Sequence, residues 1–86
     1  MAGYPNDVFT IYAGDGVKQI NVLRIFDRWG ELVYEGYNFP PNDPLFGWDG
    51  IFRGEPMNPA VFAYYTIVDF IDGKQRLYKG DVTLAR

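Results

Sequence analysis

Both tryptophans of this chain lie beside a glycine, in stretches where the backbone is expected to turn. The first stretch is Asp27-Arg28-Trp29-Gly30 and the second is Trp48-Asp49-Gly50. Glycine adopts a positive φ without steric cost, whereas residues with a Cβ rarely do. A nearby aspartate can accept a hydrogen bond from a backbone N–H two residues on. We therefore predict that both stretches are structural turns capped by their aspartates.

Short segments rich in β-branched and aromatic residues lie between such turns, as expected for strands. The segments predicted to be strands are 7–12, 20–27, 31–35, 51–53, 61–71 and 75–85. Six prolines and ten glycines interrupt the chain too often for long helices. The predicted fold class is therefore all-β: a small antiparallel immunoglobulin-like β-sandwich of six to seven strands, with a small open barrel as the alternative.

The connections between strands carry their own turn signals. The loop Arg28-Trp29-Gly30 predicts a type I turn followed by a G1 bulge. Asp72-Gly73 is typical of a two-residue hairpin that joins the last two strands. Gly80, inside the final strand, predicts a bulge there.

The longest apolar segment, 61–71, has apolar residues on both of its faces. That pattern indicates either a central strand or a strand that offers one face to a partner. Tyr64 and Val68 are expected in the core, whereas Phe62 fits either role. An unpaired final strand can also add to the edge of a neighbouring sheet, which allows a weak homodimer.

The absence of three residue types limits the chemistry open to this chain. It contains no cysteine, histidine or serine, so it lacks thiol and serine nucleophiles, an imidazole base and the usual zinc ligands. We predict that the chain is not an enzyme and has no catalytic, cofactor-binding or metal-binding residues. Oxygen atoms of Gly14-Asp15-Gly16 and Asp43 could coordinate calcium, but the spacing matches no EF-hand loop, and solvated turns are the favoured interpretation.

Charge and hydropathy argue against two further classes of partner. The net charge is −3, with 8 basic and 11 acidic side chains and no basic run, so no nucleic-acid partner is expected. No apolar run approaches the roughly 18 residues of a membrane span, and the first residues do not resemble a signal peptide. With 86 residues, the chain is expected to be one domain, 1–86, within a longer exported protein.

An ordered set of short motifs covers nearly the whole chain. The motifs are Pro5-Asn6-Asp7-Val8-Phe9, Leu23-Arg24-Ile25-Phe26-Asp27-Arg28-Trp29-Gly30, Val33-Tyr34-Glu35, Trp48-Asp49-Gly50, Val61-Phe62-Ala63-Tyr64, Asp72-Gly73 and Lys79-Gly80-Asp81-Val82-Thr83-Leu84-Ala85-Arg86. This set resembles the gliding motility-associated C-terminal domain, the type B sorting domain of the type IX secretion system of Bacteroidota. The first motif is shorter than the acidic loop typical of that family, so 1–6 is interpreted as a trimmed or redesigned start, and cation binding by the loop is not expected.

The resemblance implies a non-catalytic C-terminal sorting signal that directs a larger cargo protein across the outer membrane, to the cell surface or into the medium. The implied partners are a covalently linked N-terminal cargo and outer-membrane translocon or shuttle components of the secretion system. Two segments are candidates for recognition by that machinery, the Arg28-Trp29-Gly30 turn and the last strand. The candidate residues of the last strand are Lys79, Gly80, Asp81, Val82, Thr83, Leu84 and Arg86.

Each candidate segment also has a purely structural interpretation. Turn chemistry alone explains the aspartate and the glycine of the first turn, so Trp29 is expected to pack at the edge of the core. If the turn is exposed, Arg28 can lie over the indole ring in a cation–π contact. The competing function is a carbohydrate-binding or adhesion module, with Trp29, Trp48 or Tyr37 as an exposed stacking platform. Burial of both indoles would remove that platform.

Overall fold

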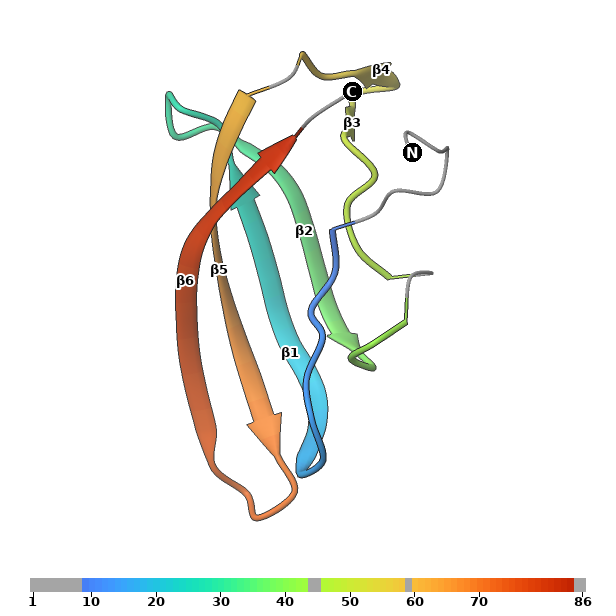
Figure 1. The fold of residues 1–86 in the computed structure, drawn as a ribbon, viewed down its shortest axis with the longest axis vertical. Coiled ribbons are helices and arrows are strands. Elements are labelled where there is room, and N and C mark those ends of the chain that lie inside the picture. Colours follow the sequence, from blue (N-terminus) through green and yellow to red (C-terminus); the bar gives the residue numbers. More distant parts are fainter. Residues whose placement is uncertain (1–8, 44–45, 59, 85–86) are drawn as a thin grey trace.

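The computed structural model describes residues 9–43, 46–58 and 60–84, which form six β-strands and no helix (Figure 1). The strands are β1 Val17–Phe26, β2 Leu32–Phe39, β3 Ile51–Phe52, β4 Glu55–Pro56, β5 Ala60–Phe70 and β6 Gln75–Leu84. The predicted all-β fold is therefore confirmed. β2 runs further than its pattern predicts, and the short strand β4 lies outside the segments predicted to be strands.

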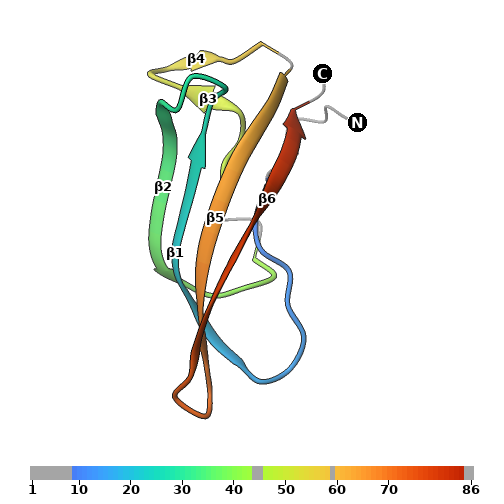
Figure 2. The ribbon, with the colours of Figure 1, turned by 90° about the vertical axis from the view of Figure 1, so that its left-hand side faces the viewer.

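Four of the strands form one antiparallel sheet in the order β2-β1-β5-β6, and β3 pairs with β4 in a separate short hairpin. Figure 2 shows the four long strands side by side, with the β3–β4 hairpin across one end. β5 lies in the middle of the sheet, as its two apolar faces indicate. β2 and β6 are the edges.

The registers fix which loops lie at which end of the sheet. Phe26, the last residue of β1, pairs with Ala63 of β5, which pairs in turn with Asp81 of β6. The β1–β2 loop therefore lies at the same end as the C-terminal end of β6. The β5–β6 loop lies at the opposite end (Figure 1).

One face of the sheet is covered by two segments outside it, 9–15 and 46–57, which lie to the right of β5 and β6 in Figure 1. The two segments meet where Phe9 and Trp48 exchange backbone hydrogen bonds of 2.8 and 2.9 Å. The buried apolar cluster consists of Ile20, Leu23, Ile25, Val33, Phe39, Trp48, Phe62 and Val68. Removal of these side chains from water is the main favourable contribution to folding.

The side chains of β5 that face this cover belong to the core. Phe62 and Val68 are buried, and Tyr64 is half-buried with its ring centroid 5.1 Å from that of Phe9. The expectation for Tyr64 and Val68 is confirmed. The open question about Phe62 is answered in favour of the core, because its ring packs edge-on against Trp48.

The strand predicted at 7–12 is wrong for the residues that the structure describes, and its first two residues lie outside them. Phe9 forms only an isolated bridge. Beyond Phe9, the backbone of the segment forms hydrogen bonds with Asn42 and, in the described part of the chain, not with a neighbouring strand. The backbone N–H of Asn42 donates to the Ile11 carbonyl at 2.9 Å, and its side-chain amide exchanges hydrogen bonds of 2.8 and 2.9 Å with the Ala13 backbone. One asparagine cannot extend a ladder, so the segment stays irregular.

The bulge predicted at Gly80 is also wrong, because β5 and β6 pair without a shift of register along their whole length. A Cβ at position 80 would lie 3.2 Å from atoms of the Tyr64 ring. Contacts this short are rare, so a larger residue would push the ring away. The ring of Tyr64 lies against the backbone of β6 at this position, where a side chain would collide with it. Close approach of another group to the backbone is, besides a bulge, a common reason for a glycine within a strand.

Candidate functional site

The first candidate segment, Arg28-Trp29-Gly30, is a loop between β1 and β2. The Asp27 N–H donates to the Glu31 carbonyl at 2.9 Å, and the Gly30 N–H donates to the Asp27 carbonyl at 3.0 Å. Gly30 has a φ of 83°, in the left-handed region that a G1 bulge requires. The predicted turn type is confirmed.

Aspartate side chains cap this loop and the Trp48-Asp49-Gly50 turn. Oδ1 of Asp27 accepts hydrogen bonds from the backbone N–H groups of Trp29 and Glu31, at 2.9 and 2.8 Å. Oδ1 of Asp49 accepts one from the Ile51 N–H at 3.0 Å. Both predicted caps are therefore confirmed. The backbone of the first loop is held by these bonds without any contribution from the indole of Trp29.

Trp29 is 81% exposed, so the expectation that it packs at the edge of the core is wrong. The loop extends past the last residue pair of β1 and β2, which is Phe26 with Leu32. The guanidinium of Arg28 lies over the indole instead, with its Cζ 5.0 Å from the ring centroid. An exposed cation–π pair of this kind contributes about 0.5–1 kcal/mol.

The loop between β5 and β6 has the same backbone geometry at the opposite end of the sheet. The Phe70 N–H donates to the Lys74 carbonyl at 2.8 Å, and the Gly73 N–H donates to the Phe70 carbonyl at 2.9 Å. Gly73 has a φ of 90°. The predicted two-residue hairpin is therefore wrong, since the loop also includes Ile71. Asp72 caps it by accepting a hydrogen bond from the Lys74 N–H at 3.0 Å.

The second candidate segment is the C-terminal half of β6. Its exposed residues are Lys79, Asp81 and Thr83, and its partly buried residues are Gly80, Val82 and Leu84. Because side chains alternate across a strand, the exposed residues lie on the uncovered face of the sheet. Val82 and Leu84 face the cover and pack against the core. Arg86 lies outside the described residues.

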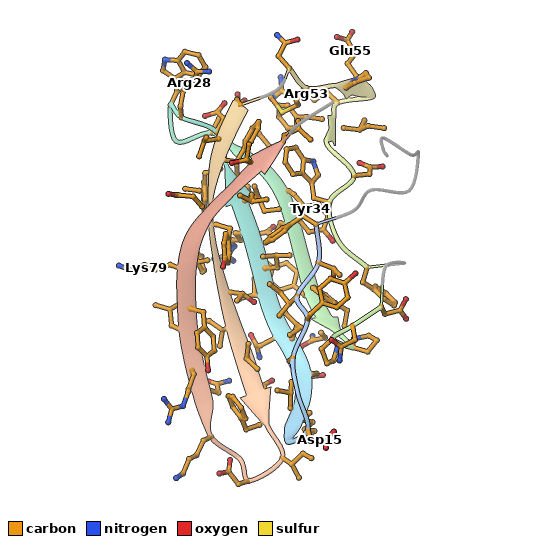
Figure 3. The ribbon with its side chains drawn as sticks, viewed as in Figure 1. Asp15, Arg28, Tyr34, Arg53, Glu55 and Lys79 are labelled. Atoms are coloured by element: carbon orange, nitrogen blue, oxygen red, sulfur yellow. The ribbon has the colours of Figure 1, made fainter. Side chains whose placement is uncertain are left out.

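The structure places the two candidate segments at the same end of the molecule. Only β5 separates β1 from β6, so the two strands lie about 10 Å apart. Figure 3 shows Arg28 at this end, together with Arg53 and Glu55 of the β3–β4 hairpin.

The β3–β4 hairpin adds a contact that sequence reasoning missed. Arg53 Nη2 lies 3.7 Å from Glu31 Oε2, beside the first loop. The Arg53 guanidinium also lies over Phe52, with its Cζ 4.9 Å from the ring centroid. This end of the molecule therefore carries two arginine–aromatic pairs. The dipeptide Arg53-Gly54 indicates a turn, but the sequence does not show that the arginine side chain contacts Glu31.

The uncovered face of the sheet carries a polar cluster around Arg24, which sequence reasoning also missed. The guanidinium donates hydrogen bonds to the carboxylate of Glu35, to the Tyr37 hydroxyl at 2.8 Å and to the Tyr65 hydroxyl. These hydrogen bonds raise the pKa of the Arg24 guanidinium, and the bond to Tyr37 has the largest effect. The pKa of the Glu35 carboxyl is lowered by hydrogen bonds from Tyr37, which has the larger effect, and from Arg24. The cluster follows from the register, in which Arg24 is paired with Glu35 on one side and Tyr65 on the other.

A second polar cluster on the same face surrounds Asp69. Its carboxylate accepts hydrogen bonds from the side-chain amides of Gln19 at 2.8 Å, Asn21 at 3.1 Å and Gln75 at 2.7 Å. These bonds, the one from Gln19 foremost, lower the pKa of Asp69. Because the donors come from β1 and β6 and the acceptor from β5, the cluster links three strands.

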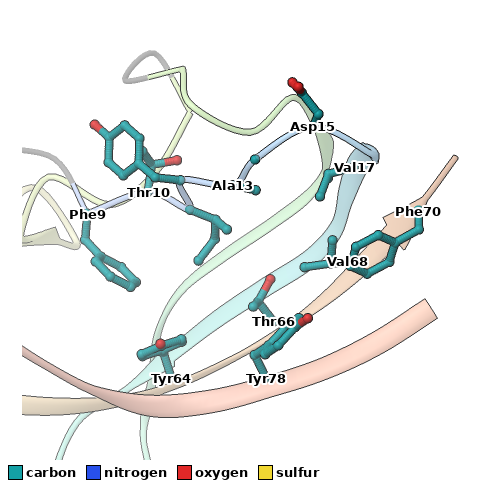
Figure 4. Close-up of a pocket in the computed structure, with 13 residues that line it drawn as sticks. Phe9, Thr10, Ala13, Asp15, Val17, Tyr64, Thr66, Val68, Phe70 and Tyr78 are labelled. Carbon is teal, nitrogen blue, oxygen red and sulfur yellow. The ribbon is translucent and has the colours of Figure 1, made fainter. Parts of the chain in front are cut away.

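A cavity of about 470 Å³ lies between the segment 9–15 and the strands beneath it (Figure 4). Tyr64 and Val68 contribute to its lining, and Asp15 is the one carboxylate among the described residues that line it. Thr10, also in the lining, is buried, and its Oγ1 has no hydrogen-bond partner among the described residues. Among the described residues, this lining contains no nucleophile with an adjacent base.

In the described part of the chain, no three acidic side chains lie close enough together to hold a metal ion. Asp15 and Asp43 therefore belong to no such group there. The same residues include no helix long and apolar enough to cross a membrane.

Comparison with known proteins identifies a family and no individual relative. A family model described as the CHU_C type IX secretion signal domain matches residues 3–84. No curated protein and no solved structure matches the chain. The matched range includes both tryptophan turns and extends to the last residue of β6.

Proposed function

Because the chain belongs to the CHU_C family of type IX secretion signal domains, we propose that the secretion machinery recognises one end of its sheet. This recognition end consists of the Arg28-Trp29-Gly30 loop and the C-terminal half of β6, Lys79 to Leu84. Arg86 belongs to the proposed set on the sequence alone.

The domain is a sorting signal that directs an attached cargo across the outer membrane, to the cell surface or into the medium. It therefore interacts with the secretion machinery and is joined to a cargo. We further propose that 1–86 acts as a single C-terminal sorting domain with the cargo on its N-terminal side. Its partners in this proposal are outer-membrane translocon or shuttle components.

The observation that carries the proposal is that Trp29 is exposed to solvent in a loop whose backbone is held by other residues. The Asp27 carboxylate and the positive φ of Gly30 fix the loop, so the ring of Trp29 adds little to folding. Tryptophan and arginine are the residues most enriched at binding hot spots. An exposed Trp29 beside Arg28 therefore fits a contact surface.

The C-terminal half of β6 supplies a different kind of contact. Lys79 and Asp81 place an ammonium group and a carboxylate on the uncovered face. Asp81 is level with Phe26, which precedes the loop, and Lys79 lies two residues further from this end of the sheet (Figure 3). Charges of both signs steer orientation more than they add affinity. We propose that the loop provides affinity and that β6 orients the domain on its partner.

In this proposal the domain acts by recognition and not by catalysis. The exposed side chains of the recognition end lie on a protruding loop and an edge strand, and they are those of Arg28, Trp29, Lys79, Asp81 and Thr83. They do not belong to the lining of the cavity beneath the segment 9–15. An arrangement of this kind can bind a surface, but it does not enclose a substrate.

The competing function, a carbohydrate-binding module, requires exposed aromatic rings, and only two of its three predicted rings, Trp29 and Tyr37, are exposed. Trp48 is buried in the core. The hydroxyl of Tyr37 is bonded to Arg24 on the uncovered sheet face, away from Trp29. The loop therefore offers one indole and no second ring from the predicted set.

A secretion assay tests the recognition end. The chain is fused to a periplasm-directed reporter in a host that has the type IX machinery, and the reporter is measured in the medium and on the surface. The double variant Arg28→Ala with Trp29→Ala is expected to lose most of the secretion. Ile71→Ala is the matched control, because Ile71 is 71% exposed in the loop of equal geometry at the opposite end.

Secretion of the double variant at the level of the Ile71→Ala control would show that the loop is not recognised. That result would leave the family assignment untouched. Circular dichroism of both purified variants shows whether each is folded, so loss of secretion can be assigned to recognition.

A further inference from the structure

We propose that a second copy of this chain pairs with the outer edge of β6, so that two four-stranded sheets join into one continuous antiparallel sheet. In the described residues, β6 pairs with β5 alone, and its other edge carries unpaired backbone groups. Such an edge is a template for strand addition. The inference rests on the geometry of β6 and shares Lys79 to Leu84 with the recognition end, but it is tested without the secretion machinery, so either proposal can fail without the other.

Of the two sheet edges, β6 is the one suited to pairing. It is 10 residues long and keeps one register against β5 throughout. β2 is less regular: its register against β1 shifts beside Phe26, and Asn38 has a φ of 52°. Bulges and left-handed residues bend an edge out of the plane of the sheet and protect it from pairing.

The existing ladder decides which backbone groups of β6 point outward. Phe70 bonds toward β6, because its N–H donates to the Lys74 carbonyl. In an antiparallel pair, bonded positions recur at every second residue, so the positions of β6 bonded to β5 are the even-numbered ones. The positions that direct N–H and C=O groups to the outer edge are Gln75, Leu77, Lys79, Asp81 and Thr83. An added antiparallel copy must pair odd-numbered positions with odd-numbered positions.

Charge then selects one register among those allowed. A two-fold axis at Gly80 sets Lys79 of each copy opposite Asp81 of the other, so two opposite-charge pairs form. An axis at Lys79 sets two lysines opposite each other, and an axis at Asp81 sets two aspartates opposite each other. Opposite charges across a ladder are favourable and like charges are not. The axis at Gly80 also pairs 76–84 completely.

Exposed apolar side chains of β6 gain neighbours in the same register. Leu77 and Tyr78 are 60% and 46% exposed in the single chain. The axis at Gly80 sets Leu77 beside Thr83 of the second copy and Tyr78 beside Val82 of the second copy. One strand pair buries less area than a standard stable interface, so the expected dimer is weak and forms at high protein concentration.

Sedimentation equilibrium over a range of concentrations tests the charge pairs. Lys79→Asp changes two attractive pairs into two repulsive ones and is expected to raise the dimer dissociation constant about tenfold or more. The exchange variant Lys79→Asp with Asp81→Lys restores both pairs and is expected to restore the dimer. Lys74→Asp is the matched control, since it makes the same change of charge before β6 begins. Failure of the exchange variant to recover the dimer would overturn the register.

Disulfide formation tests the register without relying on affinity. The chain has no cysteine of its own, so Tyr78→Cys and Val82→Cys each introduce a single thiol. The axis at Gly80 makes positions 78 and 82 of different copies a close, non-hydrogen-bonded pair, which suits a disulfide. Oxidation of the two variants mixed together is expected to give a crosslinked dimer faster than oxidation of either alone. Equal rates, or a chain that stays monomeric at every concentration, would overturn the proposal.

Discussion

The indole of Trp48 meets the ring of Phe62 edge-on, with the ring centroids 4.9 Å apart and the planes at 68°. The indole N–H donates to the Ile51 carbonyl at 3.0 Å, so the polar atom of the ring is satisfied inside the core. Trp48 is 4% exposed, whereas Trp29 is 81% exposed. The two tryptophan turns have similar residues, yet one indole belongs to the core and the other to the surface.

The two indoles are expected to differ in fluorescence. With Trp29→Phe, the remaining emission comes from buried Trp48 and is expected to be blue-shifted and poorly quenched by iodide. With Trp48→Phe, emission from Trp29 is expected at longer wavelength and to be readily quenched. Similar quenching in the two variants would contradict the assignment of one indole to the core.

The two tryptophans are also expected to differ in their contribution to stability. Trp48→Ala removes a buried ring and its contact with Phe62, so the free energy of unfolding is expected to fall by about 3–5 kcal/mol. Trp29→Ala removes only the contact with Arg28 and is expected to cost at most about 1 kcal/mol. Urea denaturation of both variants measures the difference. A cost above 2 kcal/mol for Trp29→Ala would show that this ring supports the fold.

Removal of Leu84 to Arg86 from a reporter fusion is expected to abolish secretion. Leu84 pairs with Ala60 and packs against the core, so the deletion also weakens the end of β6. A fusion that lacks only the last two residues separates the two effects, because it keeps Leu84. Normal secretion of the longer deletion would be incompatible with a sorting role for the final strand.

Acid is expected to destabilise the sheet through Asp69. Its pKa is lower in the folded chain than in the unfolded one, because Gln19, Gln75 and Asn21 donate to the carboxylate. The stabilisation is present above the unfolded pKa of about 3.9 and is lost as the pH falls from there through the folded pKa. Asp69→Asn cannot lose a charge, so its unfolding free energy is expected to depend less on pH below about 4. Gln19→Ala is expected to lie between the two. Identical pH profiles for all three proteins would exclude the carboxylate as the cause.

Features set by neighbouring residues were predictable from the sequence. The type I turn with its G1 bulge at Arg28-Trp29-Gly30 and the caps by Asp27 and Asp49 follow from residues within a few positions of each other. The central strand at 61–71 and the all-β class follow from residue pattern in the same way. The ordered motifs also identified the family, because family signatures are conserved in sequence order.

Features set by distant residues were not predictable. The Arg24 cluster joins β1 to Tyr65, and the Asp69 cluster joins β5 to Gln19, so both require the register between strands far apart in sequence. The sequence predicted a bulge at Gly80 because it does not show that the ring of Tyr64 lies against this position.

The sequence by itself determined where the two tryptophan turns lie, which of the longer segments are strands and to which family the chain belongs, since each depends on local conformational preference or on the order of motifs. The tertiary structure decided which face of the sheet is covered. That choice buried Trp48, left Trp29 in solvent and placed the first loop at the same end as the last residues of β6. Burial depends on what packs above a residue, and in this fold the covering segments come from distant parts of the chain.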